Sequence, residues 1–148
     1  MIIGEGEDRP KIEQAIRTLN NVYLLAFQPR NLMPEIISSA DLCTVLLSME
    51  PIFSVAFPTK FYEYIACNKP VIAICKGELS EVINFNKIGY AVAKENIDDL
   101  VQFIKTIKDS SDLLTSTEQN VKNVLYRYSL NNISLKLGSI LKTEFRSK

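Results

Sequence analysis

The sequence contains no histidine, so chemistry that depends on an imidazole side chain is excluded. Neither a Ser-His triad nor histidine general acid–base catalysis can be built. The three cysteines, Cys43, Cys67 and Cys75, lie inside apolar runs at irregular spacing. An odd count without regular spacing argues against a disulfide framework and fits a reducing cytoplasm. Without histidine or paired cysteines, the usual zinc, copper and iron ligand sets cannot be assembled, and we expect no metal cofactor.

The chain also lacks an excess of either charge. Lys plus Arg and Asp plus Glu number 17 each, so no strong field favours nucleic acid, and we expect none as a partner. From residue 121 onward, however, basic side chains outnumber the one acidic residue, Glu144; they are Lys122, Arg127, Lys136, Lys142, Arg146 and Lys148. This segment is typical of a solvated helix face, with contact to phospholipid or to an acidic domain as the alternative.

Long hydrophobic runs are missing as well. No apolar stretch approaches the ~20 residues that cross a bilayer, and no signal-peptide pattern opens the sequence. We therefore expect a cytoplasmic protein that is soluble or at most peripheral to the inner face of a membrane. With 148 residues, 47% of them hydrophobic, the chain is long enough for one core, and we expect a single domain over residues 1–148.

Short apolar runs alternate with helical patterns along the chain. The runs show no clean alternation with polar residues, which is typical of strands buried on both faces of a parallel sheet; they are 1–3, 21–27, 42–47, 71–75 and 90–92. Helices are predicted over about 8–20, 34–40, 59–67, 80–87 and 96–107, and two more close the chain over 111–128 and 129–143. Asp8 and Asn96 are candidate caps, and Pro10 suits a first turn.

This order predicts an α/β fold with a doubly wound, Rossmann-like parallel sheet and right-handed crossovers. Ligands of such folds bind beyond the carboxyl ends of the strands. Attention therefore belongs on four connections, which are residues 4–8, 27–31, 48–58 and 76–80.

The connection over 48–58, "SMEPIFSVAFP", is longer than the roughly two to six residues usual between a strand and a helix. It leads to a helix that we expect to begin near Pro58 or Thr59. The free amides of Thr59, Lys60 and Phe61 would point out of that helix end, where the helix dipole favours anions. Lys60 adds a full positive charge at the same place, so the helix start predicts a phosphate site.

Glu63 lies four residues after Thr59, on the same helix face and about one turn, ~5.4 Å, further along. A carboxylate at that distance from a phosphate can accept two hydrogen bonds from a sugar diol, as acidic residues do for ribose. The same pattern also occurs on plain solvated helices. The helix should end at Asn68, which tolerates a left-handed conformation, because Pro70 prevents its continuation.

Together these segments resemble a known family. "PTKFYEYIACNKPVIAI" (58–74) followed by "KGELSEVINFNKIGYAVAKENIDDLVQFI" (76–104) is similar to the donor-binding, C-terminal domain of retaining glycosyltransferases of family 4, which have the two-domain GT-B fold. "IIGEGEDRPKIEQ" (2–14) and "NVYLLAFQPRNLMPEIISSADLCTVLL" (21–47) resemble the upstream strands, turns and helices of that domain. The segment 129–148 resembles the final helix that crosses back to the N-terminal domain in this family.

The resemblance implies roles for individual residues. Glu63 matches the glutamate that holds the nucleotide ribose, and Thr59 and Lys60 match the amides that hold the distal phosphate. A second family glutamate, which touches the donor sugar, would fall at Val55, and Pro58 replaces the usual glycine. These departures resemble a subgroup with a Gly-Glu pair in the next loop.

In this chain that pair is Gly77-Glu78, so the sugar contacts would shift to Glu78 or to the amides of 76–79. Phe27 and Gln28 would flank the base, mostly through backbone. That loop does not distinguish uracil from guanine, although a UDP-sugar is the favoured substrate.

The resemblance further implies that family members begin this domain with one more strand and a loop whose Arg and Lys neutralise the diphosphate. That strand would lie between the strands beginning near Met1 and near Leu42. Its absence would leave two unpaired inner edges or force those two strands to pair. We therefore expect a fragment or one half of a split enzyme, marginally stable by itself, whose partner is an N-terminal GT-B domain in cis or in trans.

The predicted function is transfer of a sugar from a nucleotide-diphosphate sugar to a glycan or lipid-linked acceptor, without a metal and with retention of configuration. This chain would bind the donor. Its sequence shows no residue that would act as the general base. A non-catalytic nucleotide-sugar-binding or interaction module is the alternative. A signalling receiver domain fits poorly, because "LCTVLLSM" (42–49) ends without an aspartate. A dinucleotide site is also weak, because Gly4-x-Gly6 lacks the third glycine.

Overall fold

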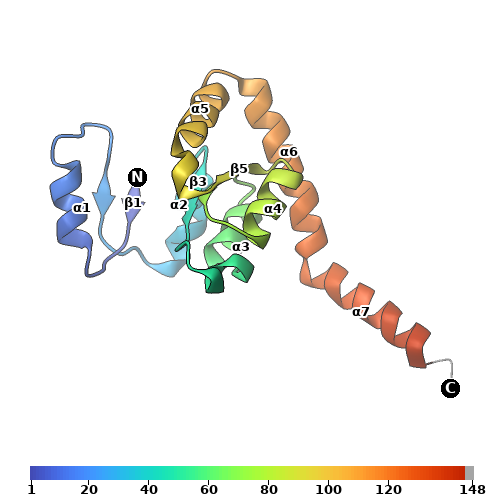
Figure 1. Cartoon of the computed structure of the whole chain (residues 1–148). Helices are drawn as coiled ribbons and strands as arrows, with labels where there is room; N and C mark the ends of the chain where they lie inside the picture. Colours follow the sequence, from blue (N-terminus) through green and yellow to red (C-terminus); the bar gives the residue numbers. More distant parts are fainter. Residues whose placement is uncertain (146–148) are drawn as a thin grey trace. The chain divides into compact units, whose positions relative to one another are not determined.

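The computed structural model of this chain describes residues 1–145, with side chains described as far as Thr143. Within that part, strands and helices alternate from β1 to β5, and two helices follow α5 without a further strand (Figure 1). The chain divides into two compact units, Met1–Ile36 and Ile37–Lys148. The prediction of a single domain stays a prediction.

The first unit is built on a small parallel sheet. It contains β1 (Ile2–Ile3), α1 (Arg9–Ile16), β2 (Leu24–Leu25) and the 3-10 turn η1 (Arg30–Leu32), and α2 (Met33–Ser38) begins in it. β1 and β2 are paired in parallel, as expected for strands joined through a helix. Both strands are shorter than the apolar runs predicted.

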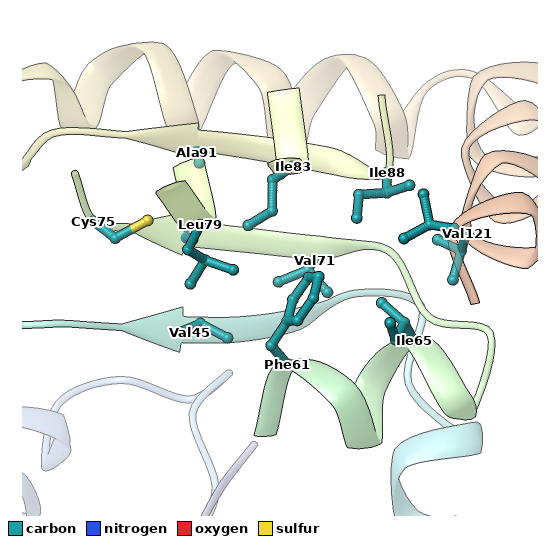
Figure 2. Close-up of a cluster of buried hydrophobic side chains, with 12 residues drawn as sticks. Val45, Phe61, Ile65, Val71, Cys75, Leu79, Ile83, Ile88, Ala91 and Val121 are labelled. Carbon is teal, nitrogen blue, oxygen red and sulfur yellow. The ribbon is translucent and has the colours of Figure 1, made fainter. Parts of the chain in front are cut away.

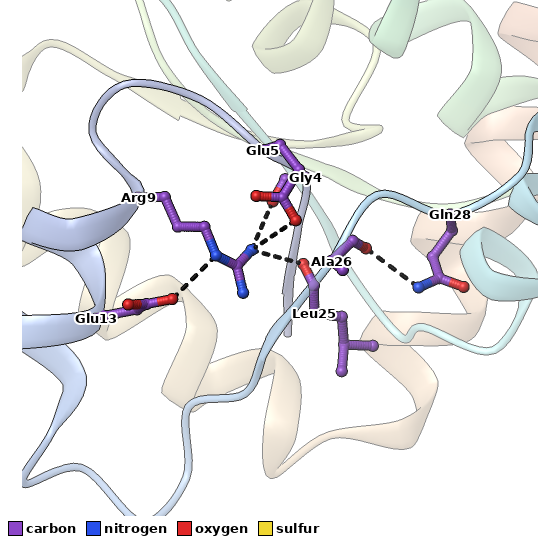
Figure 3. A network of polar contacts seen from close by, with 7 residues as sticks. All are labelled: Gly4, Glu5, Arg9, Glu13, Leu25, Ala26 and Gln28. Atoms are coloured by element: carbon purple, nitrogen blue, oxygen red, sulfur yellow. Dashed lines mark hydrogen bonds and ion pairs between the residues drawn. The ribbon is translucent and has the colours of Figure 1, made fainter.

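A single arginine forms hydrogen bonds at the carboxyl ends of both strands (Figure 3). The Arg9 guanidinium donates to the carbonyl oxygens of Gly4 at 2.9 Å and Leu25 at 3.4 Å, and it pairs with the carboxylates of Glu5 and Glu13. Asp8 is the N-cap residue of α1, as predicted, but its side chain makes no capping bond. It pairs instead with Lys11 at 2.6 Å.

The second unit is a three-stranded parallel sheet between two helical layers. Its strands are β3 (Cys43–Leu46), β4 (Val71–Ile74) and β5 (Gly89–Val92), in that spatial order. One face is covered by α3 (Thr59–Ala66), α4 (Glu78–Phe85) and α6 (Ser111–Tyr128), and the other by α5 (Ile97–Lys108). The structure therefore has the parallel α/β layering that the sequence predicted.

β4 is buried on both faces, which explains its unbroken apolar sequence. Val71, Ala73 and Cys75 belong to the larger core. Figure 2 shows Phe61 of α3 and Leu79 and Ile83 of α4 packed near Val71 and Cys75. Ile72 and Ile74 belong to the smaller core beneath α5.

Cys43 and Cys75 carry free thiols, and both are buried. Burial raises the pKa of the Cys43 and Cys75 thiols to about 11, which makes both poor nucleophiles at neutral pH.

Two helices of the larger core end in the same left-handed turn. Asn68 has a φ of 58°, and the amides of Asn68 and Lys69 donate to the carbonyls of Ile65 and Tyr64. This is a Schellman motif, and it confirms the predicted end of α3. Lys87, with a φ of 53°, ends α4 in the same way, although a lysine gives no such signal in the sequence.

The side chain of Asn84 occupies the outer edge of β5. Its amide donates to the Ala91 carbonyl and accepts from the Ala91 amide, both at 2.9 Å. A side-chain amide therefore takes the place of a neighbouring strand, which protects an exposed sheet edge.

The last two helices meet at one extended residue, Ser129. α6 is capped by Ser110, whose hydroxyl accepts from the Leu113 amide at 3.2 Å, whereas Asn96 makes no side-chain bond as the cap of α5. α7 (Leu130–Phe145) then extends away from the sheet of its unit (Figure 1). Its apolar side chains are largely exposed, including Leu130 (84%) and Leu137 (55%).

β1 pairs with β2 in the first unit, and β3 pairs with β4 in the second. The two predicted alternatives for the inner strand edges, unpaired or joined by direct pairing, stay predictions. The hypothesis of a fragment or split enzyme stays a prediction.

Substitution of Gly89 tests how closely β4 and β5 are packed. Its φ is +150°, and a Cβ added there would lie 1.8 Å from the Val71 carbonyl oxygen. We expect Gly89→Ala to lower the free energy of unfolding by about 3 kcal/mol, measured by urea denaturation, because backbone on the paired strand would have to move. Gly138→Ala is the control, since its Cβ meets nothing within 4 Å, and it should raise stability by about 0.5–1 kcal/mol. Equal effects of the two substitutions would contradict this account.

Candidate functional site

The candidate site lies where β3 and β4 end. Because these strands are parallel neighbours, their carboxyl ends share one edge of the sheet, and the chain that follows each strand begins there. After β3 comes a 3-10 turn, η2 (Pro51–Val55), and then α3; after β4 come Cys75, Lys76 and Gly77, and then α4. The long connection over 48–58 is thus partly helical, which the sequence did not predict.

α3 begins at Thr59, with Pro58 as an extended N-cap residue. The Phe61 amide donates to the Pro58 carbonyl at 2.9 Å, so the expectation that it is free is wrong. The amides of Thr59 and Lys60 have no acceptor in the described part of the chain, and both side chains are exposed. Two unpaired amides and one ammonium group therefore lie at this helix end.

Aromatic packing fixes the start of α3. The Phe57 ring lies 5.8 Å from that of Phe61 and 6.2 Å from that of Tyr62. The contact between the residue before the cap and the fourth helical residue is a hydrophobic staple, which sets the angle at which the chain enters a helix. Phe61 is fully buried, so the helix start is tied to the core.

Glu63 lies one turn into α3 and is half-buried. Its carboxylate has no ion pair or hydrogen bond within residues 1–145, although its backbone carbonyl accepts from Cys67 at 3.1 Å. The spacing predicted between Thr59 and Glu63 is thus realised on one regular helix. A carboxylate without a partner is available to hydroxyl donors.

α4 begins two residues earlier than predicted, at Glu78. Gly77 is its N-cap residue, with a φ of 81° that favours glycine, and Leu79 is fully buried. Glu78 and Glu81 are both exposed in the first turn, where the helix dipole stabilises carboxylates. Glu78 is therefore a helical residue at the sheet edge and not a loop residue.

The two helix starts differ in charge. The first turn of α3 carries Lys60 and no acidic residue, whereas that of α4 carries two carboxylates. An anion is favoured at α3 and repelled at α4, while groups that donate hydrogen bonds are favoured at Glu78. The sheet edge is thus divided into an anion-binding part and a donor-binding part.

Lys76 precedes Gly77 and forms an ion pair that the sequence did not suggest. Its Nζ lies 2.8 Å from Oε1 of Glu95, a residue that follows β5. The hydrogen bond from Lys76 holds the pKa of the Glu95 carboxyl below its ordinary value.

Phe27 and Gln28 belong to the first unit and follow β2. The Phe27 side chain is 73% exposed, and Gln28 donates to the Ala26 carbonyl at 3.1 Å (Figure 3). Their role beside a base stays a prediction.

The described residues offer neither a metal site nor a helix that could span a membrane. Within residues 1–145, no group of three or more Cys, Asp or Glu side chains is placed to hold a metal ion. Every helix in that range is too short or too polar to cross a bilayer.

Comparison with known proteins gives one family and several relatives. Residues 1–124 match the model of the family described as glycosyl transferases group 1. The uncharacterized glycosyltransferase MJ1178 of Methanocaldococcus jannaschii is 29% identical over 128 residues, which are 86% of this chain and 36% of that protein.

Solved structures share the fold. HepE (Alr3699) of Anabaena, crystallised with UDP-glucose, superposes with a TM-score of 0.71 at 21% identity over 95% of this chain and 40% of HepE. WaaG, a glycosyltransferase involved in lipopolysaccharide biosynthesis, gives 0.69 at 19% identity over 93% of this chain and 36% of WaaG. These likenesses confirm the predicted Rossmann-like α/β fold. The chain spans less than half the length of each of these relatives.

The ion pair at Lys76 can be tested by titration. In Lys76→Met we expect the pKa of Glu95 to rise toward its ordinary value of 4.5, because the hydrogen bond that favours the carboxylate is lost. The pKa is measured by NMR of the Glu95 carboxyl carbon in both proteins. Lys94→Met is the control, because Lys94 is adjacent to Glu95 in sequence but is not its ion-pair partner. An unchanged pKa in Lys76→Met would contradict the observed contact.

Proposed function

Because the chain belongs to the glycosyl transferases group 1 family, as its sequence predicted, we propose that it binds a nucleotide-diphosphate sugar at the carboxyl ends of β3 and β4 and forms the donor-binding half of a glycosyltransferase. This proposal rests on the groups found at the start of α3. There, two unpaired amides, an exposed lysine and a partnerless glutamate lie within one and a half turns of a rigid helix.

The division of charge orients the donor. The distal phosphate of the nucleotide lies at the amides of Thr59 and Lys60, and the ribose hydroxyls donate to Glu63. The sugar then lies toward the first turn of α4, where Glu78 accepts hydrogen bonds from its hydroxyls and the amides around Gly77 supply donors. A role of Phe27 and Gln28 beside the base, with uracil favoured, stays a prediction.

The contribution to the reaction is electrostatic. As the bond between the sugar and the diphosphate breaks, negative charge grows on the departing phosphate. The helix amides and Lys60 stabilise that charge, because they are already oriented toward it before the reaction begins. The reaction we propose is a metal-independent transfer with retention of configuration. No residue of this chain is assigned as a general base.

A complete enzyme needs a second domain and an acceptor. We propose an N-terminal GT-B domain, supplied in cis or in trans, which packs against the exposed apolar face of α7. That face is formed by Leu130, Ile133, Leu137, Ile140 and Leu141. The acceptor is a glycan or a lipid-linked sugar, and the latter would bring a cytoplasmic enzyme to the inner face of the membrane.

A second candidate, a nucleotide-sugar-binding module without catalytic activity, is favoured by one observation. Val55, at the position of the family's sugar-contacting glutamate, is an apolar side chain that is 64% exposed on η2. Both candidates require donor binding. They differ in whether transfer occurs once the acceptor-binding domain is present.

Calorimetric titration with UDP tests the donor site. We expect Glu63→Ala to weaken UDP binding about 10- to 100-fold, because hydrogen bonds to a charged group contribute about 1.5–3 kcal/mol. Glu118→Ala is the matched control, since Glu118 is also half-buried on a helix and forms no ion pair with the residues that the structure describes. Binding that survives Glu63→Ala unchanged would exclude the proposed ribose contact.

Lys60→Ala tests the orientation of the nucleotide. It should weaken binding of UDP but leave binding of UMP nearly unchanged, because only UDP carries the distal phosphate. Glu63→Ala should weaken both nucleotides equally. If Lys60→Ala weakens UMP as much as UDP, the phosphates do not lie as proposed. GDP and dTDP, titrated in parallel, report the choice of base.

Leu137→Asp tests the α7 face in a mixture of this chain with an N-terminal GT-B domain, UDP-glucose and a glycan acceptor. Because Leu137 is exposed, we expect the substitution to leave UDP binding unchanged and to abolish transfer. Lys136→Asp, which changes charge beside the apolar face, is the control. Transfer at the wild-type rate by Leu137→Asp would remove the α7 face from the proposed interface, and no transfer by the wild-type mixture would favour the binding module.

A further inference from the structure

Gly77 has a backbone conformation and a contact that only glycine permits. Its φ is +81° and its ψ is −150°, a region essentially limited to glycine. A Cβ added there would lie 2.0 Å from the carbonyl oxygen of Ser54, and 2.7 Å from both its carbonyl carbon and its Cα. Since the opposing atoms are all backbone, no change of rotamer could relieve the overlap.

The segment that Gly77 contacts is itself stiff. In η2, the Phe53 amide donates to the Glu50 carbonyl at 3.0 Å and the Ala56 amide to the Phe53 carbonyl at 3.1 Å. The Ser54 hydroxyl donates to the Pro51 carbonyl at 2.7 Å. The contact with Gly77 therefore positions a formed turn against the start of α4.

The start of α3 is held by different contacts. Four residues, 55–58, separate Ser54 from Thr59, and among them Phe57 packs on Phe61 and Tyr62. A shift of η2 can be absorbed before the chain reaches Thr59, because Phe57 is anchored in the core. The two helix starts at this edge are thus positioned independently.

We infer that Gly77 is a positioning residue of the donor site, whose contact with Ser54 sets the separation between η2 and the first turn of α4 and thereby shapes the part that receives the sugar. The inference rests on the proposed function. The phosphate part, at Thr59 and Lys60, does not depend on this contact.

Other glycines show that the contact is specific. A Cβ at Gly4, Gly6 or Gly138 would meet nothing within 4 Å. Gly89 does approach backbone closely, but that approach is to Val71 of the paired strand β4 and is explained by the sheet. Gly77 alone among these five brings two connections together at the sheet edge.

The test compares two ligands on Gly77→Ala. By calorimetry on the full chain, we expect the affinity for UDP-glucose to fall about tenfold or more, while the affinity for UDP changes by less than about threefold. A merely structural defect would lower both affinities together. Gly138→Ala is the control, and its two affinities should remain at the wild-type values.

Ser54→Ala changes the other segment of the contact, η2, and tests the inference if the Gly77→Ala protein does not fold. It removes the bond from the Ser54 hydroxyl to the Pro51 carbonyl, which stiffens η2, and should shift the ratio of the two affinities in the same direction but by less. Ser116→Ala is the matched control, because the Ser116 hydroxyl makes the equivalent bond, 2.9 Å to Leu113, on α6.

The outcomes separate this inference from the proposed function. Loss of UDP-glucose affinity alone supports the positioning role. Equal loss of both affinities, or no loss of either, overturns the inference and leaves the donor site standing. If the wild-type chain binds neither ligand, the proposed function fails and the inference falls with it.

Discussion

The burial of β4 on both faces is the constraint from which the site follows. Val71, Ala73 and Cys75 pack toward α3, α4 and α6, and the alternate residues pack toward α5. A parallel strand buried in this way requires a helical layer on each side, and each crossover must return the chain to the same end of the sheet. The starts of α3 and α4 are therefore adjacent because of packing, before any ligand is considered.

The two helix starts carry opposite side-chain charges, so the two parts of this sheet edge favour different chemical groups. Two helix starts with the same dipole would compete for a single anion if their side chains were alike. Here α3 carries Lys60, while α4 carries Glu78 and Glu81, so an anion has one favoured place and hydroxyl donors have another. A sugar joined to a phosphate, in which hydroxyl donors adjoin an anion, is complementary in charge to this arrangement.

Much of this arrangement could be predicted from the sequence, because its signals are local. Asn68 followed by Pro70 marks the end of α3, and the apolar run at 71–75 marks a buried strand. The start of α4 differs from the prediction because it depends on Gly77, whose close approach to the distant Ser54 backbone has no local signal in the sequence. The bond from Phe61 to Pro58 was likewise missed, because it depends on how tightly the first turn closes.

α7 differs from the other helices of the second unit in how little of its apolar surface is buried. α6 continues the core through Val121 and Val124, which are fully buried, whereas α7 turns away at Ser129 and leaves Leu130 and Leu137 exposed. An isolated helix of about 16 residues is marginally stable in water, because nucleation is costly and each added residue contributes little. A stripe of exposed aliphatic side chains adds stability only when it is covered, by about 25 cal/mol for each Å² of apolar surface removed from water. α7, unlike α3 and α4, therefore gains little stability from the core of its own unit.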